Sequence, residues 1–198
     1  MNKSRVFPIL LAAGSSGRLG FPKPLARFGE KTALEIAVAN CAGLAPPVVV
    51  LGSDANLVRP AVPRGLRVVI HQRWRRGQLS SLLAGLRKVP RDAAFLIYPV
   101  DHPLLTRAIV QRLVRAFERR KARYAIVMPI FGRRPGHPVI CEAEIRRELR
   151  RGDTAREVVY REPRRILKVR MKTAAVCRDF DSPATYFECL GSFPARRA

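Results

Sequence analysis

The sequence predicts an α/β fold of three layers, in which a mostly parallel central sheet carries helices on both faces in a Rossmann-like arrangement. Short apolar segments alternate along the chain with segments of helical periodicity, which is typical of strands joined by crossover helices. The short segments are apolar almost without interruption, as expected of parallel strands buried on both faces. With 198 residues, 47% of them hydrophobic and 27% charged, the chain can bury a substantial core. We therefore expect one domain over residues 1–198.

Turn residues bound the expected strands. The five clearest strands are expected at residues 6–11, 48–52, 66–71, 93–101 and 124–130. After about residue 130 the pattern is less regular. The stretch GRRPGHPVIC is expected as a loop that enters a strand, and the segments 165–171 and 174–181 as two late strands.

Capping residues indicate where the helices begin. Thr32 is a suitable N-cap for a helix over residues 33–41, with Glu35 in its first turn. Ser80 or Ser81 is expected to cap a helix whose leucines share one face. Further helices are expected over residues 109–120, 142–151 and 183–190. The first of these three is amphipathic, with its arginines outward.

The chain is strongly basic, with a formal net charge of +23 that comes from 31 arginines and 7 lysines against 15 acidic residues. Such a charge can indicate nucleic-acid binding. However, the arginines are spread from Arg5 to Arg197, aromatic residues make up only 7% of the chain, and no basic stretch interleaves with aromatic residues as a stacking platform would. A solvated arginine-rich surface or a polyanionic small substrate fits better, so nucleic acid is not an expected partner.

The cysteines and the apolar segments favour a cytoplasmic protein. Cys41, Cys141, Cys177 and Cys189 are widely spaced and form no CxxC pair, which fits neither a zinc site nor a disulfide scaffold, so reduced thiols are expected. No apolar run approaches the ~20 residues of a membrane span. A cleaved signal over residues 1–17 is the alternative, but a buried first strand explains the same residues.

The first expected strand ends in a glycine-rich turn that two cations follow. The stretch reads LAAGSSGRLGFPK, and its candidate nucleotide-binding residues are Leu11, Ala12, Ala13, Gly14, Ser15, Arg18 and Lys23. Glycine lets backbone N–H groups approach an anion without obstruction by a Cβ atom, and the two cations can neutralise phosphate oxygens. The stretch is neither GxxxxGK[ST] nor GxGxxG, which disfavours a P-loop ATPase and a dinucleotide oxidoreductase. An ordinary turn with solvated cations is the alternative.

Carboxylates follow other expected strands, where ligands collect in open α/β sheets. Asp101, in IYPVDHPLL, is an oxygen ligand well placed for Mg²⁺, although capping of the next turn explains it equally well. His102 beside it is a candidate ligand or base. In RDFDSPATYFE, Asp179 and Asp181 point to one face if that segment is extended. Two carboxylates on one face repel unless a cation or proton intervenes, and an Asx cap at the end of a strand is the alternative.

Two further stretches carry polar residues that suit a nucleotide or its acceptor. In GQLSSLLAGL, Gln78, Ser80 and Ser81 stand at an expected helix N-terminus, whose free N–H groups and hydroxyls can bind a nucleotide. Plain N-capping explains the same serines. In GRRPGHPV, His137 lies in a loop constrained by glycine and proline, where a functional and a merely structural role are equally supported.

Taken in order, these motifs resemble those of nucleotidyltransferases of the molybdenum-cofactor type, in particular the molybdenum cofactor cytidylyltransferases. LAAGSSGRLGFPK is similar to the family's LAAGxSxRxGxxK, GQLSSLLAGL to its serine–leucine helix, and PVDHPLL, more weakly, to its GDQPL turn. GHPV, RRGDTAREVV and DFDSPATY correspond to its GHPV, GDxGAR and DIDTPxDY stretches. The resemblance spans almost the whole chain. Val100, His102, Thr154 and Ser182 depart from the family's pattern, but Asp101 is retained.

The resemblance implies Mg²⁺-dependent transfer of a nucleoside monophosphate, CMP from CTP, to a phosphorylated acceptor such as molybdopterin or molybdenum cofactor, with release of pyrophosphate. It implies Lys23, Arg18 and Asp101 as catalytic residues. It also implies that Asp101, with Asp181 or Asp179, holds the metal.

On the acceptor side, the same resemblance implies that His137 and His102 face the acceptor, and that a molybdoenzyme or a cofactor-delivery protein is a partner. A transferase that acts on a sugar phosphate or another phosphorylated metabolite keeps the chemistry with a different acceptor. A basic nucleic-acid-binding domain and a non-catalytic nucleotide-binding chaperone are the alternatives from other classes, and the retained carboxylates argue against the chaperone.

Overall fold

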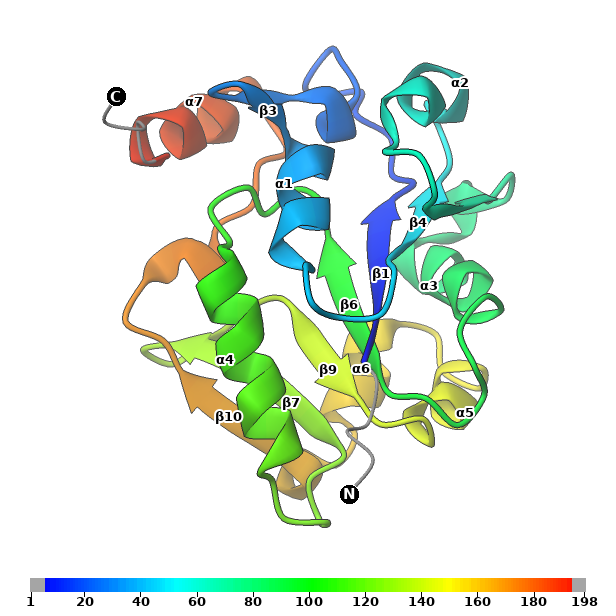
Figure 1. Ribbon diagram of the computed structural model, residues 1–198, viewed down its shortest axis with the longest axis vertical. Coiled ribbons are helices and arrows are strands. Elements are labelled where there is room, and N and C mark those ends of the chain that lie inside the picture. The colour runs from blue at the N-terminus through cyan, green and yellow to red at the C-terminus, as the bar shows by residue number, and fades with distance from the viewer. Residues whose placement is uncertain (1–5, 194–198) are drawn as a thin grey trace.

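The computed structural model describes residues 6–193 and centres on an eight-stranded sheet (Figure 1). Its strand order is β10-β7-β9-β6-β1-β4-β5, and β8 pairs with β7 beside this path. The strands are β1 (Phe7–Ala12), β4 (Val48–Leu51), β5 (Arg67–Ile70), β6 (Phe95–Pro99), β7 (Ile126–Phe131), β8 (Arg134–Pro135), β9 (Val139–Cys141) and β10 (Ile166–Arg170). Lys3 and Arg5, which belong to the alternative of a signal segment, lie outside the described residues.

Most strand pairs of this sheet are parallel. β1 pairs in parallel with β4 and β6, β4 with β5, and β7 with β10. Within the described residues the antiparallel members of the sheet are β9, which lies between β6 and β7, and the short β8. The predicted fold class, a mostly parallel sheet within an α/β fold, is therefore confirmed.

Helices cover both faces of the sheet (Figure 1). On one face lie α1 (Ala33–Asn40) and α4 (Arg107–Glu118), and on the other α3 (Gln78–Leu86), α5 (Ile145–Leu149) and α6 (Ala155–Tyr160). Alternate residues of β1 enter the two cores, since side chains of a strand point to opposite faces. Leu10 packs in the core beneath α1 and α4, whereas Ile9 packs beneath α3 and α5.

Local capping explains why several helices begin where they do. The Thr32 hydroxyl accepts a hydrogen bond from the Glu35 amide, and the Glu35 carboxylate accepts one from the Thr32 amide. This capping box starts α1 at the predicted residue. The Thr106 hydroxyl starts α4 in a similar way, two residues before the predicted helix.

The predicted start of α3 is wrong. Neither Ser80 nor Ser81 caps this helix, which begins at Gln78 after Gly77. Gly77 has a φ of +93°, a conformation that favours glycine, and it turns the chain into the helix earlier than a serine cap would. The Ser80 hydroxyl, already within the first turn, donates to the Gly77 carbonyl at 2.8 Å.

The expected late strand over residues 174–181 is also wrong. The Thr173 hydroxyl accepts a hydrogen bond from the Ala175 amide and starts a 3₁₀ turn over Ala174–Cys177. The segment crosses strand ends instead of joining the sheet, because the Val176 carbonyl accepts from the His137 amide and the Phe180 amide donates to the Asp101 carbonyl.

Smaller differences concern short elements. The helix expected over residues 142–151 is limited to α5, since its first residues form a turn. The structure adds α2 (Ala55–Val58), α6, and a hairpin of β2 (Arg27–Phe28) and β3 (Lys31–Thr32). The C-terminal helix α7 (Pro183–Ser192) begins as predicted and runs two residues further. The chain from residue 6 to residue 193 has no helix with the length and apolar character that a membrane crossing needs.

Gly85 of α3 allows this helix to lie directly on the sheet. A Cβ atom there would come within 2.7 Å of Ile9 Cγ2 and 2.8 Å of Val50 Cγ2. We expect Gly85→Ala to lower the free energy of unfolding by up to about 2 kcal/mol, because overpacking costs ~1–3 kcal/mol and the helix propensity of alanine returns ~1 kcal/mol. Urea denaturation measures this change.

Gly191 of α7 provides the control. A Cβ atom at Gly191 would have no neighbour within 4 Å, so Gly191→Ala is expected to leave stability unchanged or to raise it. Equal effects of the two substitutions would show that α3 does not require the close contact.

Candidate functional site

A groove of about 320 Å³ opens where β1 and β6 end, at the carboxyl edge of the sheet. The turn after β1, the turn after β6 and the segment before α3 form its walls. The residues that line it are Leu11, Ala12, Ala13, Gly14, Ser15, Lys23, Pro24, Trp74, Arg75, Gly77, Gln78, Ser81, Pro99, Val100 and Asp101. Most of the predicted nucleotide-binding residues are thus brought together around one cavity.

Ser16, which the sequence analysis missed, organises the turn after β1. Its buried hydroxyl accepts a hydrogen bond from the Lys23 amide at 2.8 Å, and its carbonyl accepts from the amides of Leu19 and Gly20. Gly20 has a φ of +83°, which a residue with a side chain rarely adopts. The chain therefore doubles back and places Lys23 beside the groove.

The turn after β1 also leaves backbone donors free. The amides of Gly14 and Ser15 donate no hydrogen bond to any residue in the range 6–193. A Cβ atom at Gly14 would have no neighbour within 4 Å, so the space beside it is open. Backbone amides exposed in a turn of small residues suit an anionic ligand.

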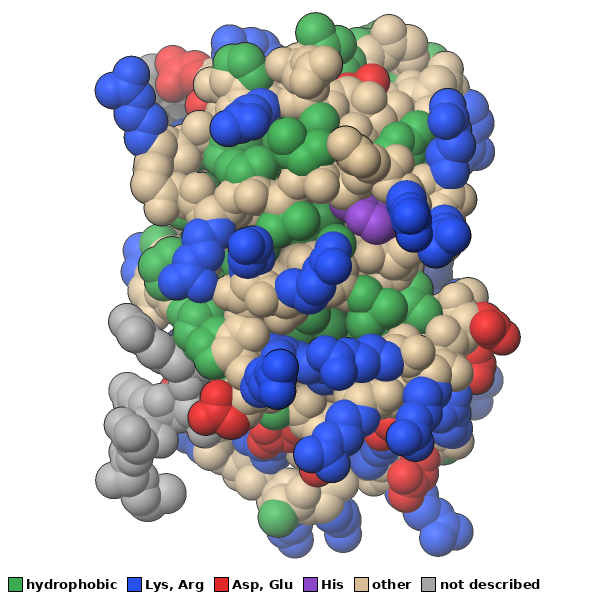
Figure 2. Space-filling model, turned by 90° about the vertical axis from the view of Figure 1, so that its right-hand side faces the viewer, with side chains coloured by type: hydrophobic (Ala, Val, Ile, Leu, Met, Phe, Trp, Pro, Cys, Tyr) green, Lys and Arg blue, Asp and Glu red, His purple; other side chains and the backbone are tan. Residues whose placement is uncertain are grey.

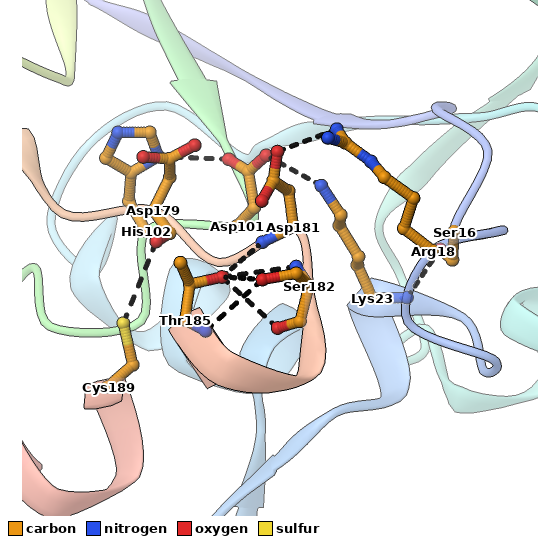
Figure 3. Close-up of polar contacts among 10 residues, drawn as sticks. All are labelled: Ser16, Arg18, Lys23, Asp101, His102, Asp179, Asp181, Ser182, Thr185 and Cys189. Carbon is orange, nitrogen blue, oxygen red and sulfur yellow. Dashed lines mark hydrogen bonds and ion pairs between the residues drawn. The ribbon is translucent and has the colours of Figure 1, made fainter. Parts of the chain in front are cut away.

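Lys23 and Asp101 meet at the groove although they lie far apart in the sequence. Lys23 Nζ is 3.5 Å from Asp101 Oδ2, and the two side chains are only 19% and 26% exposed. Asp101 Oδ1 is 3.0 Å from His102 Nδ1 (Figure 3). Burial raises the pKa of Asp101, but the hydrogen bond and charge of His102, together with the charge of Lys23, outweigh it and leave that pKa below its usual value. The carboxylate is therefore ionised at neutral pH.

Asp181 belongs to a loop that is fixed against the same turn. The Phe180 amide donates to the Asp101 carbonyl at 3.1 Å, and the Asp181 amide donates to the Thr185 hydroxyl at 3.0 Å. The Asp181 carboxylate pairs with Arg18 at 2.7 Å (Figure 3). Arg18 comes from the turn after β1 but does not line the groove, and its side chain is 76% exposed. Because the Arg18 side chain is exposed, this ion pair is weak, and Arg18 can readily exchange Asp181 for another anion.

Among the described residues, the Asp179 carboxylate forms no ion pair with the cations of the turn after β1. The residue is exposed, and its carbonyl, not its side chain, contacts Cys189. Because residues 178–181 form a loop and not a strand, no strand geometry holds Asp179 and Asp181 on one face.

The predicted acceptor residues, His102 and His137, lie next to each other. Their ring centroids are 4.9 Å apart in an edge-to-face arrangement. His102 is buried, and Nδ1 of His137 is buried without a hydrogen-bond partner in the described part of the chain. Burial, reinforced by the charge of His102, lowers the pKa of His137 to about 4. His137 therefore brings an uncharged, unpartnered nitrogen to the side of Asp101 and His102.

Trp74 and Arg75 line the groove and were missed by the sequence analysis. The Arg75 guanidinium lies 4.8 Å from the centroid of the Trp74 ring, within the range of a cation–π contact. Gly52, directly after β4, admits the Trp74 side chain, since a Cβ atom at Gly52 would lie 2.8 Å from Trp74 Cβ and 2.4 Å from the Ala13 carbonyl oxygen. The available signal was that Trp74 is the only tryptophan of the chain and lies in a basic stretch just before the GQLSS motif.

The serine–leucine helix contributes only part of what was expected. Gln78 and the buried Ser81 line the groove, but Ser80 lines a different cavity on the other side of the segment before α3. Ser80 Oγ lies 2.9 Å from His71 Nε2. Gln78 and Ser81, three residues apart on the helix, share the face toward the groove, and Ser80, rotated by about 100° from Ser81, points to the other cavity.

Carboxylate oxygens make the site suitable for a hard cation. In the described part of the chain no three His, Cys, Asp or Glu side chains are grouped so that they could hold a metal on their own. Asp101 and Asp181 instead provide two carboxylates on adjoining loops, facing the two cations of the turn after β1 (Figure 3). This donor set fits Mg²⁺, which is commonly held by one or two carboxylates, with waters and substrate phosphates as its other ligands.

Comparisons with known proteins give a family match, a curated relative and several similar solved structures. The family described as MobA-like NTP transferase domain matches residues 8–174. Nicotine blue oxidoreductase of Paenarthrobacter nicotinovorans is 33% identical over 145 residues, which cover 70% of this chain and 71% of that protein. The crystal structure of Rv0371c from Mycobacterium tuberculosis H37Rv is 28% identical, with a TM-score of 0.80, and covers 96% of this chain and 100% of its own. A complex of Rv0371c with manganese is 25% identical, with a TM-score of 0.76, and covers 95% of this chain and 99% of its own.

The lowered pKa of His137 predicts a specific dependence of stability on pH. In the folded protein His137 stays neutral down to about pH 4, whereas in the unfolded chain it binds a proton below about pH 6.5. Its contribution is therefore fully present above pH 6.5 and is lost as the pH falls towards 4, with a slope of at most ~1.4 kcal/mol per pH unit. We expect His137→Gln to flatten the decline of the free energy of unfolding across this window. Parallel curves for the two proteins would contradict the buried, neutral state of His137.

Proposed function

Because the chain belongs to the MobA-like NTP transferase family, we propose that this nucleotidyltransferase transfers CMP from CTP, with Mg²⁺, to a phosphorylated acceptor of the molybdopterin type and releases pyrophosphate. The family match confirms the resemblance predicted from the ordered motifs. Within the family, the Ala-Ala-Gly form of the turn after β1 supports CTP, since it is similar to the cytidine-using branch.

The observation that carries the proposal is the contact of Lys23 with Asp101 at one groove. Lys23, which would neutralise the triphosphate, and Asp101, which would bind the metal, lie 3.5 Å apart. A triphosphate in the groove would take Lys23 as its counter-charge and leave the Asp101 oxygens to the metal. The site thus exchanges one set of ion pairs for another without unpaired charges.

The turn after β1 would hold the triphosphate. The free amides of Gly14 and Ser15 donate hydrogen bonds to phosphate oxygens, and Lys23 neutralises them. Arg18, which is exposed and pairs with Asp181, would move from that carboxylate to the phosphates. Gln78, Ser81 and the Trp74 ring, on the opposite wall, contact the nucleoside.

Asp101 and Asp181 would hold the metal. When bound, Mg²⁺ supplies positive charge that stabilises the developing negative charge on the phosphates. The manganese in the Rv0371c complex supports a divalent cation in a relative of this fold. The lowered pKa of Asp101 keeps this carboxylate ionised and ready to bind a cation without releasing a proton.

In the transfer, an oxygen of the acceptor phosphate forms a bond to the α-phosphorus of CTP. The bond from that phosphorus to the bridging oxygen breaks, and its electron pair leaves with pyrophosphate. Catalysis then depends on position and charge more than on covalent chemistry by the protein. His102 and His137 would contact the acceptor. The uncharged His137, with its unpartnered Nδ1, suits a hydrogen bond to a neutral polar group of the acceptor.

Two competing functions predict different products, and each can be tested. A sugar phosphate in place of molybdopterin keeps the same site with a different acceptor. The name of the Paenarthrobacter relative supports a test for reduction of a dye such as nicotine blue. A cytoplasmic location, with a molybdoenzyme or a cofactor-delivery protein as partner, follows from the proposed acceptor.

Asp101→Asn tests the metal-binding role. The substitution keeps the shape of the side chain but removes its charge, so we expect kcat to fall at least ~10²-fold, as for the loss of a charge-stabilising group in other enzymes. Release of pyrophosphate from CTP in the presence of Mg²⁺ and acceptor measures the change, and circular dichroism checks the fold.

Asp179→Asn is the matched control, since it removes the same charge from the loop that carries Asp181. We expect it to retain activity within about threefold, because screening leaves an exposed charge little effect, whereas Asp181→Asn should resemble Asp101→Asn. A fully active Asp101→Asn protein would exclude the proposed metal site.

A screen of CTP, GTP, ATP and UTP against molybdopterin, molybdenum cofactor and sugar phosphates tests the reaction itself. We expect pyrophosphate only when CTP and a molybdopterin-type acceptor are both present with Mg²⁺. Release with GTP, or with a sugar phosphate alone, would overturn the proposed donor or acceptor while keeping the transferase. Oxidation of a nicotinamide cofactor by a dye, with no pyrophosphate from any pair, would replace the transferase by a redox function.

A further inference from the structure

A second cavity, of about 540 Å³, lies between α3 and α5 on the other side of the segment that joins β5 to α3. Its lining residues are Ile70, His71, Gln72, Arg73, Arg76, Ser80, Leu83, Ala84, Leu86, Arg87, Arg146 and Arg150. None of them lines the groove at the ends of β1 and β6. The cavity is therefore a separate feature, and the function proposed above leaves it unexplained.

The residues that line the cavity concentrate positive charge. Its five arginines come from three segments, the β5–α3 connection, the end of α3, and α5 with the residue after it: Arg73, Arg76, Arg87, Arg146 and Arg150. In the described part of the chain no Asp or Glu lines the cavity, and none of the five arginines forms an ion pair. Figure 2, which looks at the side of the molecule that carries α3, shows Lys and Arg side chains around apolar patches.

Arg146 is the buried member of this cluster. Its side chain donates to the carbonyls of Val89 and Pro90, at 3.3 and 2.9 Å. The residue is only 6% exposed, and its Nε is buried without a hydrogen-bond partner among the described residues. Burial, followed by the charge of Arg150, lowers the pKa of Arg146. A buried guanidinium whose donors are not all satisfied is costly unless an anion compensates it.

The part of the cavity formed by the β5–α3 connection is preorganised by hydrogen bonds. The Ser80 hydroxyl donates to the Gly77 carbonyl at 2.8 Å and lies 2.9 Å from His71 Nε2. These contacts fix the β5–α3 connection against the first turn of α3. The floor between the charges is apolar, formed by Leu83, Ala84 and Leu86.

We propose that this cavity binds a compact polyphosphate anion, either inorganic or the polyphosphate tail of a nucleotide. Guanidinium groups from three segments converge on one hollow, which suits a small anion with several oxygens, since Arg binds phosphate oxygens in pairs. An extended nucleic acid would call for several aromatic side chains on which bases stack, and among the described residues no Phe, Tyr or Trp lines the cavity. The proposal does not depend on the transferase reaction.

Calorimetric titration with inorganic tripolyphosphate tests the proposal, at an ionic strength of about 0.15 M so that diffuse charge effects are screened. The titration uses the Arg18→Ala/Lys23→Ala protein, because the groove could itself bind polyphosphate. We expect one binding site per chain in this background. Adding Arg87→Gln/Arg150→Gln is expected to weaken binding at least ~10-fold, since two charge-assisted contacts are lost.

The matched control is Arg112→Gln/Arg115→Gln in the same background, which removes the same charge from α4 on the opposite face of the sheet. Both residues are exposed and lie outside the cavity. We expect this pair to leave the affinity within about twofold, because screening limits the effect of distant charges. Thermal unfolding confirms that all variants fold.

The arms of the experiment separate the sources of the anion. Tighter binding of ATP than of tripolyphosphate in the Arg18→Ala/Lys23→Ala background identifies a nucleotide as the ligand, and equal or weaker binding identifies inorganic polyphosphate. No binding in that background, or equal loss with the cavity pair and the α4 pair, would overturn the proposal. The proposal would also fail if the affinity for an RNA 20-mer fell equally with both arginine pairs while the affinity for tripolyphosphate fell with neither. The arginines would then act as a diffuse basic surface.

Discussion

The ion pair between Lys23 and Asp101 is the interaction on which the candidate site at the carboxyl edge of the sheet depends. It follows from the order of the strands, since β1 and β6 are parallel neighbours with Leu11 opposite Pro99. The Val100 amide continues this pairing by donating to the Leu11 carbonyl. The two chains therefore leave the sheet together, and their next residues share one groove. Ser16 then determines how far the first chain travels before Lys23 returns to Asp101.

Close approach of backbones shapes the rest of this edge. Gly52, directly after β4, admits both Ala13 of the turn after β1 and the Trp74 side chain. At Gly136 a Cβ atom would lie 2.2 Å from the Val176 carbonyl oxygen, so only glycine lets the loop before β9 pass beneath the segment that leads to Asp181. Because these turns contact one another directly, short polar side chains are enough to bridge them.

The sequence was sufficient for the features that depend on local patterns. Apolar runs identified the five clearest strands, the Thr32 cap identified α1, and the glycine-rich turn identified the residues that line the β1 side of the groove. Features that depend on tertiary contact were not accessible. Trp74 becomes part of the site only because Gly52 admits it, and the segment 174–181 had the composition of a strand while its hydrogen bonds lie across strand ends.

The reversed direction of β9 determines which part of the chain can meet Asp101. Val139, the first residue of β9, lies opposite Ile97 of β6 because the two strands are antiparallel. The loop before β9 consequently emerges beside the turn after β6, and His137 arrives next to His102. A parallel strand in this position would deliver its following loop to that edge and carry its preceding loop to the far end of the sheet. One antiparallel strand thus lets a loop that precedes a strand reach the carboxyl edge of a parallel sheet, where otherwise only the loops that follow strands lie.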